Sequence, residues 1–351
     1  MPADTGSATG STGSTGTTTT AVTSAASPAQ PVLSVRNLSV SFPGRRGVLK
    51  ALDDVSFDLA PGEILGMVGE SGAGKSMTGL AVQRLLEPPG QISGGEVHLL
   101  GQRIDQLPEA QMERLRGKQI GAVFQDPLTS LNPLFTVGHQ IAETVRVHLG
   151  GSRRAAMDRA RELRRRVGIP APDERVNHYP HEFSGRMRQR VVIALALAAE
   201  PRLIIADEPT TALDVSIQAQ IMSLLRRLCD ETGVAMLLVT HDMGVIGQTA
   251  DRIAVMYAGR LIELAPVDEV LRHPRHPYTR GLIGAIPALR KRVPRLTQID
   301  GAMPRLDAIP TGCAFNPRCA EAGPRCRARR PELTPTAAGT VACWLNDGGV
   351  A

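Results

Sequence analysis

A phosphate-binding pattern occupies residues 69–76, which read Gly-Glu-Ser-Gly-Ala-Gly-Lys-Ser. An apolar run suited to a buried strand precedes it, and residues 77–86 after it carry apolar side chains at helical spacing. Glycines let backbone N–H groups curl around a phosphate, and the following helix directs unpaired N–H groups and its positive dipole end to the same place. Lys75 would contact the β- and γ-phosphates, and the Ser76 hydroxyl could ligate Mg²⁺. The alternative, a glycine-rich turn that binds nothing, is disfavoured by the complete strand–turn–helix context.

Polar side chains end three further apolar runs that read as buried strands. Asp207 and Glu208 follow the run 202–206, where the first suits a Mg²⁺ ligand through water and the second a general base acting on water. Gln125 and His241 end the other two runs. Ligands of α/β proteins bind at the carboxyl ends of the strands, so we expect these side chains to share one edge of a sheet. For Gln125 a capped strand end, and for His241 a structural role, are the alternatives.

The elements that must position these residues can be read along the chain. Residues 33–42 and 52–59 alternate apolar and polar side chains around a turn-rich piece, which predicts two antiparallel strands. Residues 94–101 look like another hairpin strand, and residues from about 136 to 197 are mainly helical in pattern. Phe42, near the end of the first strand, could stack on an adenine ring or belong to the core.

Length and composition limit the class of protein. The 351 residues suffice for one large domain with an appendage or for two domains, and no apolar run is long enough to span a bilayer. Residues 1–30 are mostly Thr, Ser, Gly and Ala, so we expect a disordered tail. The tail lacks the basic start and apolar centre of a signal peptide, and a cytosolic location is therefore expected.

The net charge of +6 is concentrated in two basic runs, residues 153–166 and 272–295. Such runs can attract nucleic acid or anionic lipid, or they can form the solvated face of a helix. No aromatic residues are interleaved in residues 153–166 for base stacking, which favours the solvated helix face and predicts no nucleic-acid partner.

Considered together, the motifs resemble the ATP-binding cassette (ABC) ATPases over about residues 32–264. The resemblance implies that one set of residues binds ATP: Phe42, Gly69, Glu70, Ser71, Gly72, Ala73, Gly74, Lys75, Ser76 and Met77. It implies a second set at the Mg²⁺ ion: Ser76, Gln125 and Asp207. Glu208, His241 and Gln125 are implied as catalytic residues, with Glu208 as the base and His241 on the γ-phosphate.

The same resemblance implies residues that meet a second ATPase subunit. Asp214 matches the D-loop acid, and Ser184-Gly185-Arg186-Met187 matches the signature motif, which serves the partner's ATP rather than its own. This family usually has a second glycine where Arg186 stands. We therefore expect the site closed by this chain's own signature to hydrolyse ATP slowly, if at all, and the phosphate loop of this chain to be the competent one. The alternative is that Arg186 rotates away and that both sites work.

The chain resembles more narrowly the oligopeptide/dipeptide importer subfamily, through residues 124–133, 179–185, 276–282 and 312–319. This resemblance implies ATP hydrolysis that energises peptide import at the cytoplasmic face of the cell membrane. It implies a second ATPase subunit, often a different chain, two transmembrane permease subunits, and an extracytoplasmic peptide-binding protein. Import of nickel or another small solute, a soluble ABC ATPase outside transport, and a non-hydrolysing ATP-gated subunit are the alternatives.

Four of the five cysteines, Cys313, Cys319, Cys326 and Cys343, lie in the last 39 residues, among several prolines. In a cytosolic chain this favours a metal site over disulfides. Thiolates suit Zn²⁺ or an iron–sulfur cluster, and the absence of a C-x2-C pair weakens the zinc interpretation. The resemblance implies a [4Fe–4S] cluster, with Zn²⁺ or no metal as alternatives. The remaining Cys229 fits an apolar helix and is expected in the core.

The expected fold is an α/β P-loop ATPase core with an antiparallel β subdomain, an inserted helical subdomain and a cysteine-rich C-terminal extension. The expected domains are a disordered tail at 1–30, an ABC nucleotide-binding domain at 31–270 with its helical subdomain at about 134–198, and the extension at 271–351.

Overall fold

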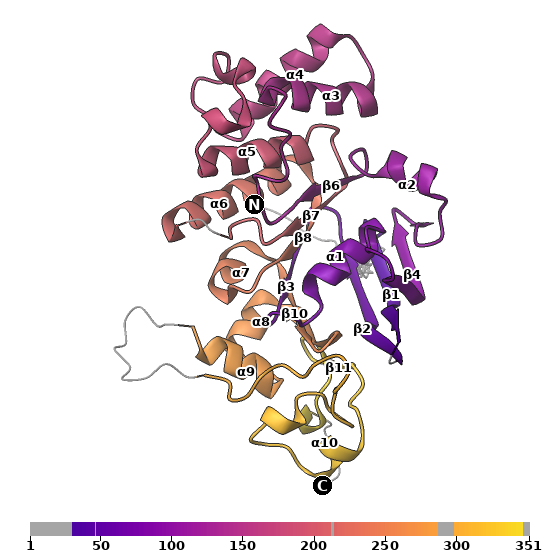
Figure 1. Cartoon of the computed structure of the whole chain (residues 1–351). Coiled ribbons are helices and arrows are strands. Elements are labelled where there is room, and N and C mark those ends of the chain that lie inside the picture. Colours follow the sequence, from indigo (N-terminus) through magenta and orange to yellow (C-terminus); the bar gives the residue numbers. More distant parts are fainter. Residues whose placement is uncertain (1–29, 46, 212–213, 287–297, 347–351) are drawn as a thin grey trace, which may run out of the picture.

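The computed structural model describes residues 30–45, 47–211, 214–286 and 298–346, so the predicted tail at 1–30 lies almost wholly outside the described residues. A mixed sheet runs through the middle of the molecule in the order β11-β12-β10-β9-β3-β8-β7-β6 (Figure 1). Its strands are β3 (Ile64–Val68), β6 (Ile120–Val123), β7 (Leu203–Asp207), β8 (Ala235–Val239), β9 (Arg252–Tyr257), β10 (Arg260–Pro266), β11 (Thr334–Thr336) and β12 (Gly339–Val341). The strands from β9 to β6 are parallel, which brings their carboxyl ends to one edge.

A separate antiparallel sheet in the order β2-β1-β4-β5 covers one face of the mixed sheet (Figure 1). Its strands are β1 (Leu33–Gly44), β2 (Gly47–Leu59), β4 (Gln91–Leu99) and β5 (Gln102–Arg103). β1 pairs antiparallel with both β2 and β4, so the predicted hairpin and the predicted third strand are confirmed.

The helices fall into a group beside the two sheets, a group that projects from the mixed sheet, and two helices below it (Figure 1). The first group comprises α1 (Lys75–Gln83), α2 (Glu109–Leu115), α6 (Val215–Thr232), α7 (Met243–Thr249) and α8 (Val267–Arg272). The helices below the sheet are α9 (Pro277–Gly284) and α10 (Pro324–Ala328). The projecting group comprises α3 (Val137–Leu149), α4 (Arg153–Arg166) and α5 (Gly185–Ala196), as the helical pattern predicted. Short 3₁₀ turns lie at Arg175–Asn177, Pro180–Glu182, Asn316–Arg318 and Trp344–Asn346.

Side chains of the parallel strands alternate between two hydrophobic cores. In β3, Ile64 and Val68 pack into the core shared with α3 to α7, whereas Leu65 and Met67 pack into the core under the antiparallel sheet. This alternation follows from the two-residue period of a strand. All five residues of β3 are buried, so the strand that leads into residues 69–76 is held rigidly from both faces.

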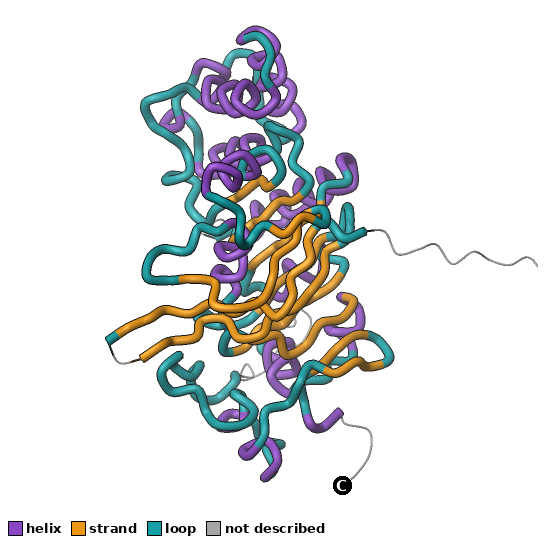
Figure 2. Tube along the Cα trace, turned by 90° about the vertical axis from the view of Figure 1, so that its right-hand side faces the viewer, coloured by secondary structure: helices purple, strands orange, loops and turns teal. Residues whose placement is uncertain are grey.

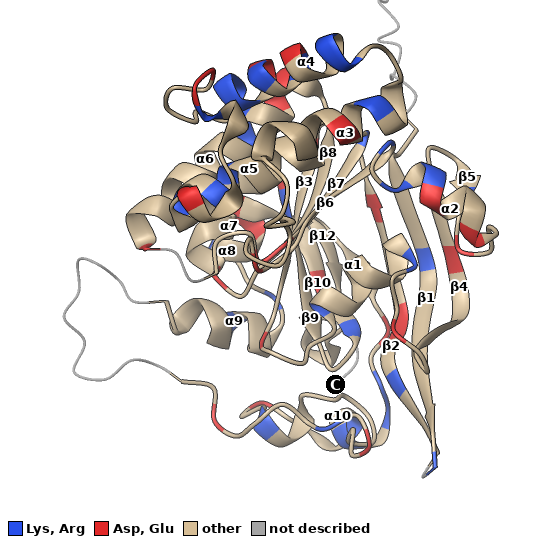
Figure 3. Ribbon diagram, turned by 45° about the horizontal axis from the view of Figure 1, so that its top comes forward, with Lys and Arg blue, Asp and Glu red and all other residues tan. Residues whose placement is uncertain are grey.

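The first predicted basic run forms α4, in which two acidic residues stand among the arginines. Figure 3 shows basic and acidic positions along this helix. Arg159 and Arg161 pair with acidic neighbours, as expected of a solvated helix face. Arg164 differs from that expectation because it is fully buried, and its two terminal nitrogens have no hydrogen-bond partner among the described residues. Burial lowers the pKa of Arg164 to about 10.

The C-terminal segment (residues 298–346) joins the core through the sheet. β12 pairs antiparallel with β10, with Glu263 opposite Val341 and Leu264 opposite Thr340, and β11 pairs with β12. The hairpin therefore extends the mixed sheet, while the loops of the segment lie below it (Figure 2). Part of the second basic run, residues 287–295, lies outside the described residues.

Candidate nucleotide-binding site

The predicted phosphate loop lies between β3 and α1, as expected. Gly69 has φ 151° and Gly74 has φ 105°, conformations that favour glycine. A Cβ at Gly69 would lie 2.4 Å from the carbonyl oxygen of Met256, so the loop approaches β9 as closely as only glycine permits. The Lys75 ammonium donates to the carbonyl oxygens of Gly69 (2.9 Å) and Glu70 (3.0 Å). Lys75 is 6% exposed, and burial lowers its pKa although the nearby carboxylates oppose that shift.

Two oxygen ligands suited to Mg²⁺ lie side by side next to the loop. The Ser76 hydroxyl donates to Asp207 Oδ1 over 3.0 Å, across the interface of α1 and β7. Burial raises the pKa of Asp207, a shift that the hydrogen bond from Ser76 and the charge of Lys75 partly offset. Mg²⁺ usually takes only one or two protein ligands and completes its shell with phosphates and water. The pair therefore fits Mg²⁺ bound together with a nucleotide.

Glu208, the predicted general base, is the centre of the site. Its carboxylate accepts hydrogen bonds from Gln125 (3.3 Å) and Thr211 (2.8 Å), and His241 Nδ1 lies 3.1 Å from Oε1. Burial opposes ionisation of Glu208, but the contacts from His241 and Thr211 outweigh it and lower the pKa. Glu208 also has φ 46°, a strained value for a residue with a side chain. The carboxylate is thus ionised and fixed in orientation.

These residues surround one cavity of about 720 Å³, within the usual range for small-molecule sites. Its lining consists of Ala51, Ser71, Gly72, Gly74, Lys75, Ser76, Met77, Gln125, Glu208, His241 and Leu306. Ala51 and Leu306 were not anticipated from the sequence. Leu306 comes from the C-terminal segment, about 230 residues after Lys75, and no local motif marks it.

Several predicted residues lie outside the lining of this cavity, among them Gly69, Glu70, Ala73 and Asp207. Phe42 is half-buried. A Cβ added at Gly90 would lie 2.6 Å from its ring, so the ring packs closely against Gly90. Stacking of Phe42 on adenine stays a prediction. Asp214 is exposed and begins α6. The signature residues 184–187 begin α5, where the Ser184 hydroxyl accepts from the Met187 amide and Arg186 is exposed. This placement is compatible with a motif that acts on another subunit.

The four C-terminal cysteines line one small cavity of about 10 Å³, together with His276 and Trp344. Burial raises the pKa of Cys343 to about 11 and also raises the pKa of Cys313 and Cys319. Among the described residues, however, no group of three or more His, Cys, Asp or Glu side chains is arranged to hold a metal ion. Cys229 is buried in the core, as predicted.

Comparison with known families gives two separate matches. The family described as "ABC transporter" matches residues 52–211, which contain the phosphate loop, Gln125 and Glu208. The family described as "Oligopeptide/dipeptide transporter, C-terminal region" matches residues 262–326.

Comparison with curated proteins finds similar full-length relatives. A putative peptide import ATP-binding protein of Brucella melitensis is 49% identical over 314 residues, covering 86% of this chain and 93% of the relative. A probable peptide ABC transporter ATP-binding protein of Sinorhizobium fredii is 48% identical over 319 residues, covering 90% of this chain and 95% of the relative.

Solved structures agree on the fold. The ATP-binding cassette MJ0796, in a dimeric post-hydrolysis state bound to ADP and phosphate, superposes with a TM-score of 0.60 at 29% identity. The match covers 67% of this chain and 98% of that one. CbiO1 of Clostridium perfringens, part of an ABC transporter complex, also gives 0.60 at 26% identity, covering 70% and 92%. The chain therefore belongs to the ABC transporter family, as an ATP-binding cassette protein that carries the oligopeptide/dipeptide transporter C-terminal region.

Proposed function

We propose that this chain is the ATP-hydrolysing subunit that energises import of oligopeptides or dipeptides through separate membrane subunits. The proposal for ATP hydrolysis rests on one cavity that Lys75, Ser76, Gln125, Glu208 and His241 line, with Asp207 hydrogen-bonded to Ser76 beside it. The match of the C-terminal region and the peptide import named for the relatives support peptides as the cargo. The alternatives are import of nickel or another small solute and an ATPase outside transport, and an uptake assay with the complete transporter distinguishes them.

In the proposed reaction each residue has a distinct task. The loop amides and Lys75 would hold the β- and γ-phosphates, and Ser76 and Asp207 would hold Mg²⁺, which would supply positive charge against the phosphates. Glu208 would orient the attacking water and accept its proton, and its lowered pKa keeps the carboxylate ionised near neutral pH. His241 and Gln125 fix the Glu208 carboxylate and reach the γ-phosphate.

The site is proposed to be completed by a second ATPase subunit. The dimeric structure of MJ0796 with ADP and phosphate supports this, as does the position of residues 184–187 outside the lining of this chain's own cavity. The partner's signature would close over the nucleotide held by Lys75, while Ser184 and Asp214 of this chain would face the partner's nucleotide. In the assembly, two permease subunits and an extracytoplasmic peptide-binding protein would complete the importer.

Arg186 gives this proposal a testable asymmetry. In the assembled transporter with only the partner's catalytic base intact, we expect Arg186→Gly to raise ATP turnover about tenfold, the effect of about 1.4 kcal/mol in the barrier. The reason is that glycine would let the N-terminal amides of α5 approach the partner's γ-phosphate. Arg154→Gly, at the same second position of α4, is the matched control and should leave turnover unchanged. Unchanged turnover in Arg186→Gly would disprove the asymmetry.

In the proposed assembly the chain would be a peripheral subunit at the cytoplasmic face of the membrane. Among the described residues no helix is long and apolar enough to cross a bilayer. We also propose the division into a nucleotide-binding domain at 31–270, with its helical subdomain at about 134–198, and an extension at 271–351. Separate family models match residues 52–211 and residues 262–326, which supports a division of the chain into two parts.

For the four cysteines we propose a [4Fe–4S] cluster that cross-links the loops of the C-terminal segment, with Zn²⁺ as the alternative. The convergence of all four thiols on one cavity supports the ligand set. Their arrangement does not yet fit, because the cavity of about 10 Å³ is smaller than a cluster and the thiols are not assembled around a common centre. Loading would therefore require the loops that carry them to move and the half-buried thiols to lose their protons.

Metal analysis of anaerobically purified protein tests this proposal. We expect about four iron and four acid-labile sulfide per chain, and loss of both in Cys343→Ser. Cys229→Ala, which changes the cysteine in the core, should keep them. A colourless, iron-free and zinc-replete sample would exclude the cluster, and a sample without either metal would exclude both assignments.

A further inference from the structure

The second residue of the phosphate loop is held by the C-terminal segment. The guanidinium of Arg318 donates to both carboxylate oxygens of Glu70, over 2.6 and 2.9 Å. Its other contacts are to Asp300 O (2.8 Å), Ile299 O (3.3 Å) and Tyr257 Oη (3.4 Å). These contacts match the five N–H donors of a guanidinium. Arg318 has a side chain only 5% exposed, so both its position and that of Glu70 are tightly defined.

Glu70 is also fixed through its main chain. Its N–H donates to the hydroxyl of Tyr278 over 2.8 Å, and its carbonyl oxygen accepts from Lys75. Tyr278 packs edge-on against Tyr257 and Phe315, with centroid separations of 4.7 and 5.4 Å. All three aromatic residues are buried. The C-terminal segment thus reaches the loop both directly, through Arg318, and through this aromatic cluster.

From these contacts we infer that Arg318 is a positioning residue for ATP: through Glu70 it holds the phosphate loop in its binding conformation and couples nucleotide affinity to the C-terminal segment. The loop needs such a restraint because glycines at 69, 72 and 74 leave its backbone unusually free. If the restraint is lost, only a fraction of molecules present the amides correctly, and the apparent Kd rises in inverse proportion to that fraction. The inference rests on the proposed assignment of residues 69–76 as the ATP site.

The coupling has a consequence for regulation. Phe315 and Arg318 lie between Cys313 and Cys319, so a change in the loop that carries these cysteines moves the residues that hold Glu70. Coupling between sites is reciprocal. Nucleotide bound at the phosphate loop therefore stabilises residues 313–319.

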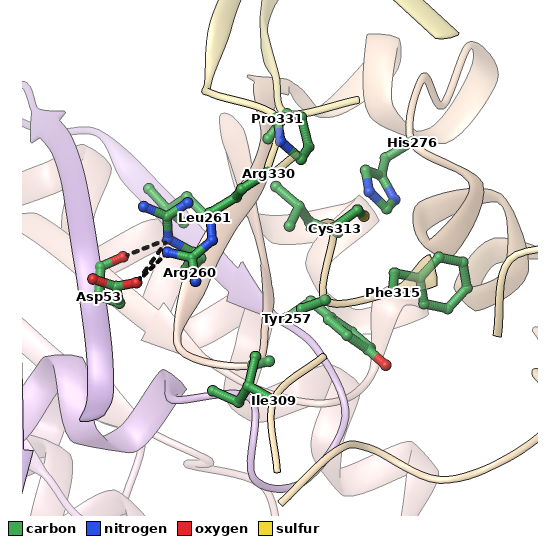
Figure 4. Close-up of a pocket in the computed structure, with 14 residues that line it drawn as sticks. Asp53, Tyr257, Arg260, Leu261, His276, Ile309, Cys313, Phe315, Arg330 and Pro331 are labelled. Carbon is green, nitrogen blue, oxygen red and sulfur yellow. Dashed lines mark hydrogen bonds and ion pairs between the residues drawn. The ribbon is translucent and has the colours of Figure 1, made fainter. Parts of the chain in front are cut away.

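The segment offers a matched control in Arg330, which pairs with Asp53 of β2 over 2.6 Å. Figure 4 shows this ion pair, next to Arg260, beside a small cavity that Cys313 and Phe315 also line. It ties the same segment to the core without touching the phosphate loop. Removing Arg330 therefore reports on general loosening of the segment.

The experiment measures binding of a fluorescent ATP analogue with Mg²⁺ to the full chain. We expect Arg318→Met and Glu70→Gln each to raise Kd about tenfold, and the double variant to lose no more than either alone, because all three remove the same interaction. Arg330→Met should bind like the unaltered protein. Amide exchange of residues 313–319 should slow on nucleotide binding in the unaltered chain and in Arg330→Met, but not in Arg318→Met. Glu70→Gln keeps the test valid if Arg318→Met does not fold.

Unaltered affinity in Glu70→Gln, an equal loss in Arg330→Met, or losses that multiply to about a hundredfold in the double variant would each overturn the inference. Failure of the ATP-site assignment itself is distinguishable. In that case the unaltered chain would not bind the analogue, or its binding would not depend on Lys75.

Discussion

Replacing Glu208 by Gln is expected to lower ATP turnover of the assembled transporter by about 10²- to 10⁴-fold while leaving ATP binding intact. The amide keeps the size and the hydrogen-bonding positions of the carboxylate but cannot accept the proton of the attacking water. In the unaltered chain His241, Thr211 and Gln125 contact the ionised carboxylate of Glu208. In the variant the same residues would contact an amide, which is not a base. The measurement is phosphate release under saturating ATP, with Kd for ATP determined in parallel.

Glu113→Gln is the matched control, because Glu113 is an exposed carboxylate on α2, away from the lining of the nucleotide cavity. It should retain full turnover. If Glu208→Gln also retained more than about half of the turnover, Glu208 would not be the base. If it lost ATP binding instead, its role would be to hold the nucleotide.

The second large effect is expected for Lys75→Ala, which should weaken ATP binding by about a hundredfold or more. Hydrogen bonds from a charged donor contribute about 1.5–3 kcal/mol each, and Lys75 is placed to give such bonds to the phosphates. Its ammonium donates to the carbonyl oxygens of Gly69 and Glu70 and is therefore already positioned in the loop. A bound nucleotide would accept hydrogen bonds from the same ammonium. Isothermal titration with an ATP analogue measures the change.

Lys118→Ala controls for the loss of one positive charge, since Lys118 is exposed. It should bind ATP like the unaltered chain. If Lys75→Ala bound ATP as tightly as the unaltered chain, residues 69–76 would not be the main phosphate contact. If Lys75→Ala and Lys118→Ala both lost the same affinity, overall charge rather than Lys75 would determine binding.

The sequence predicts those site residues that directly follow a buried strand. Asp207, Glu208, Gln125 and His241 each end an apolar run, and parallel pairing of those runs brings them to one edge. The phosphate loop was recognisable because glycine spacing, Lys75 and the flanking elements are all local in sequence. The antiparallel hairpin and the helical segment were likewise evident from their periods.

Features that depend on contacts distant in sequence could not be predicted. Arg318 and Glu70 are separated by 248 positions, and nothing in either neighbourhood indicates the other. Leu306 reaches the nucleotide cavity only because the C-terminal segment folds back over it. Arg164 was assigned to a solvated face by composition, but its place on α4 buries it. Tertiary packing decides each of these, and local patterns carry no signal for it.

The most direct test of the central claim is uptake of a labelled oligopeptide into vesicles that contain the complete transporter, with ATP supplied on the side of this subunit. The membrane and binding proteins for the assembly would be those that co-purify with this chain. We predict ATP-dependent peptide accumulation that the Glu208→Gln variant abolishes and Glu113→Gln preserves. ATP hydrolysis without peptide uptake, uptake of nickel in place of peptide, or a chain that binds no membrane subunit would contradict the account.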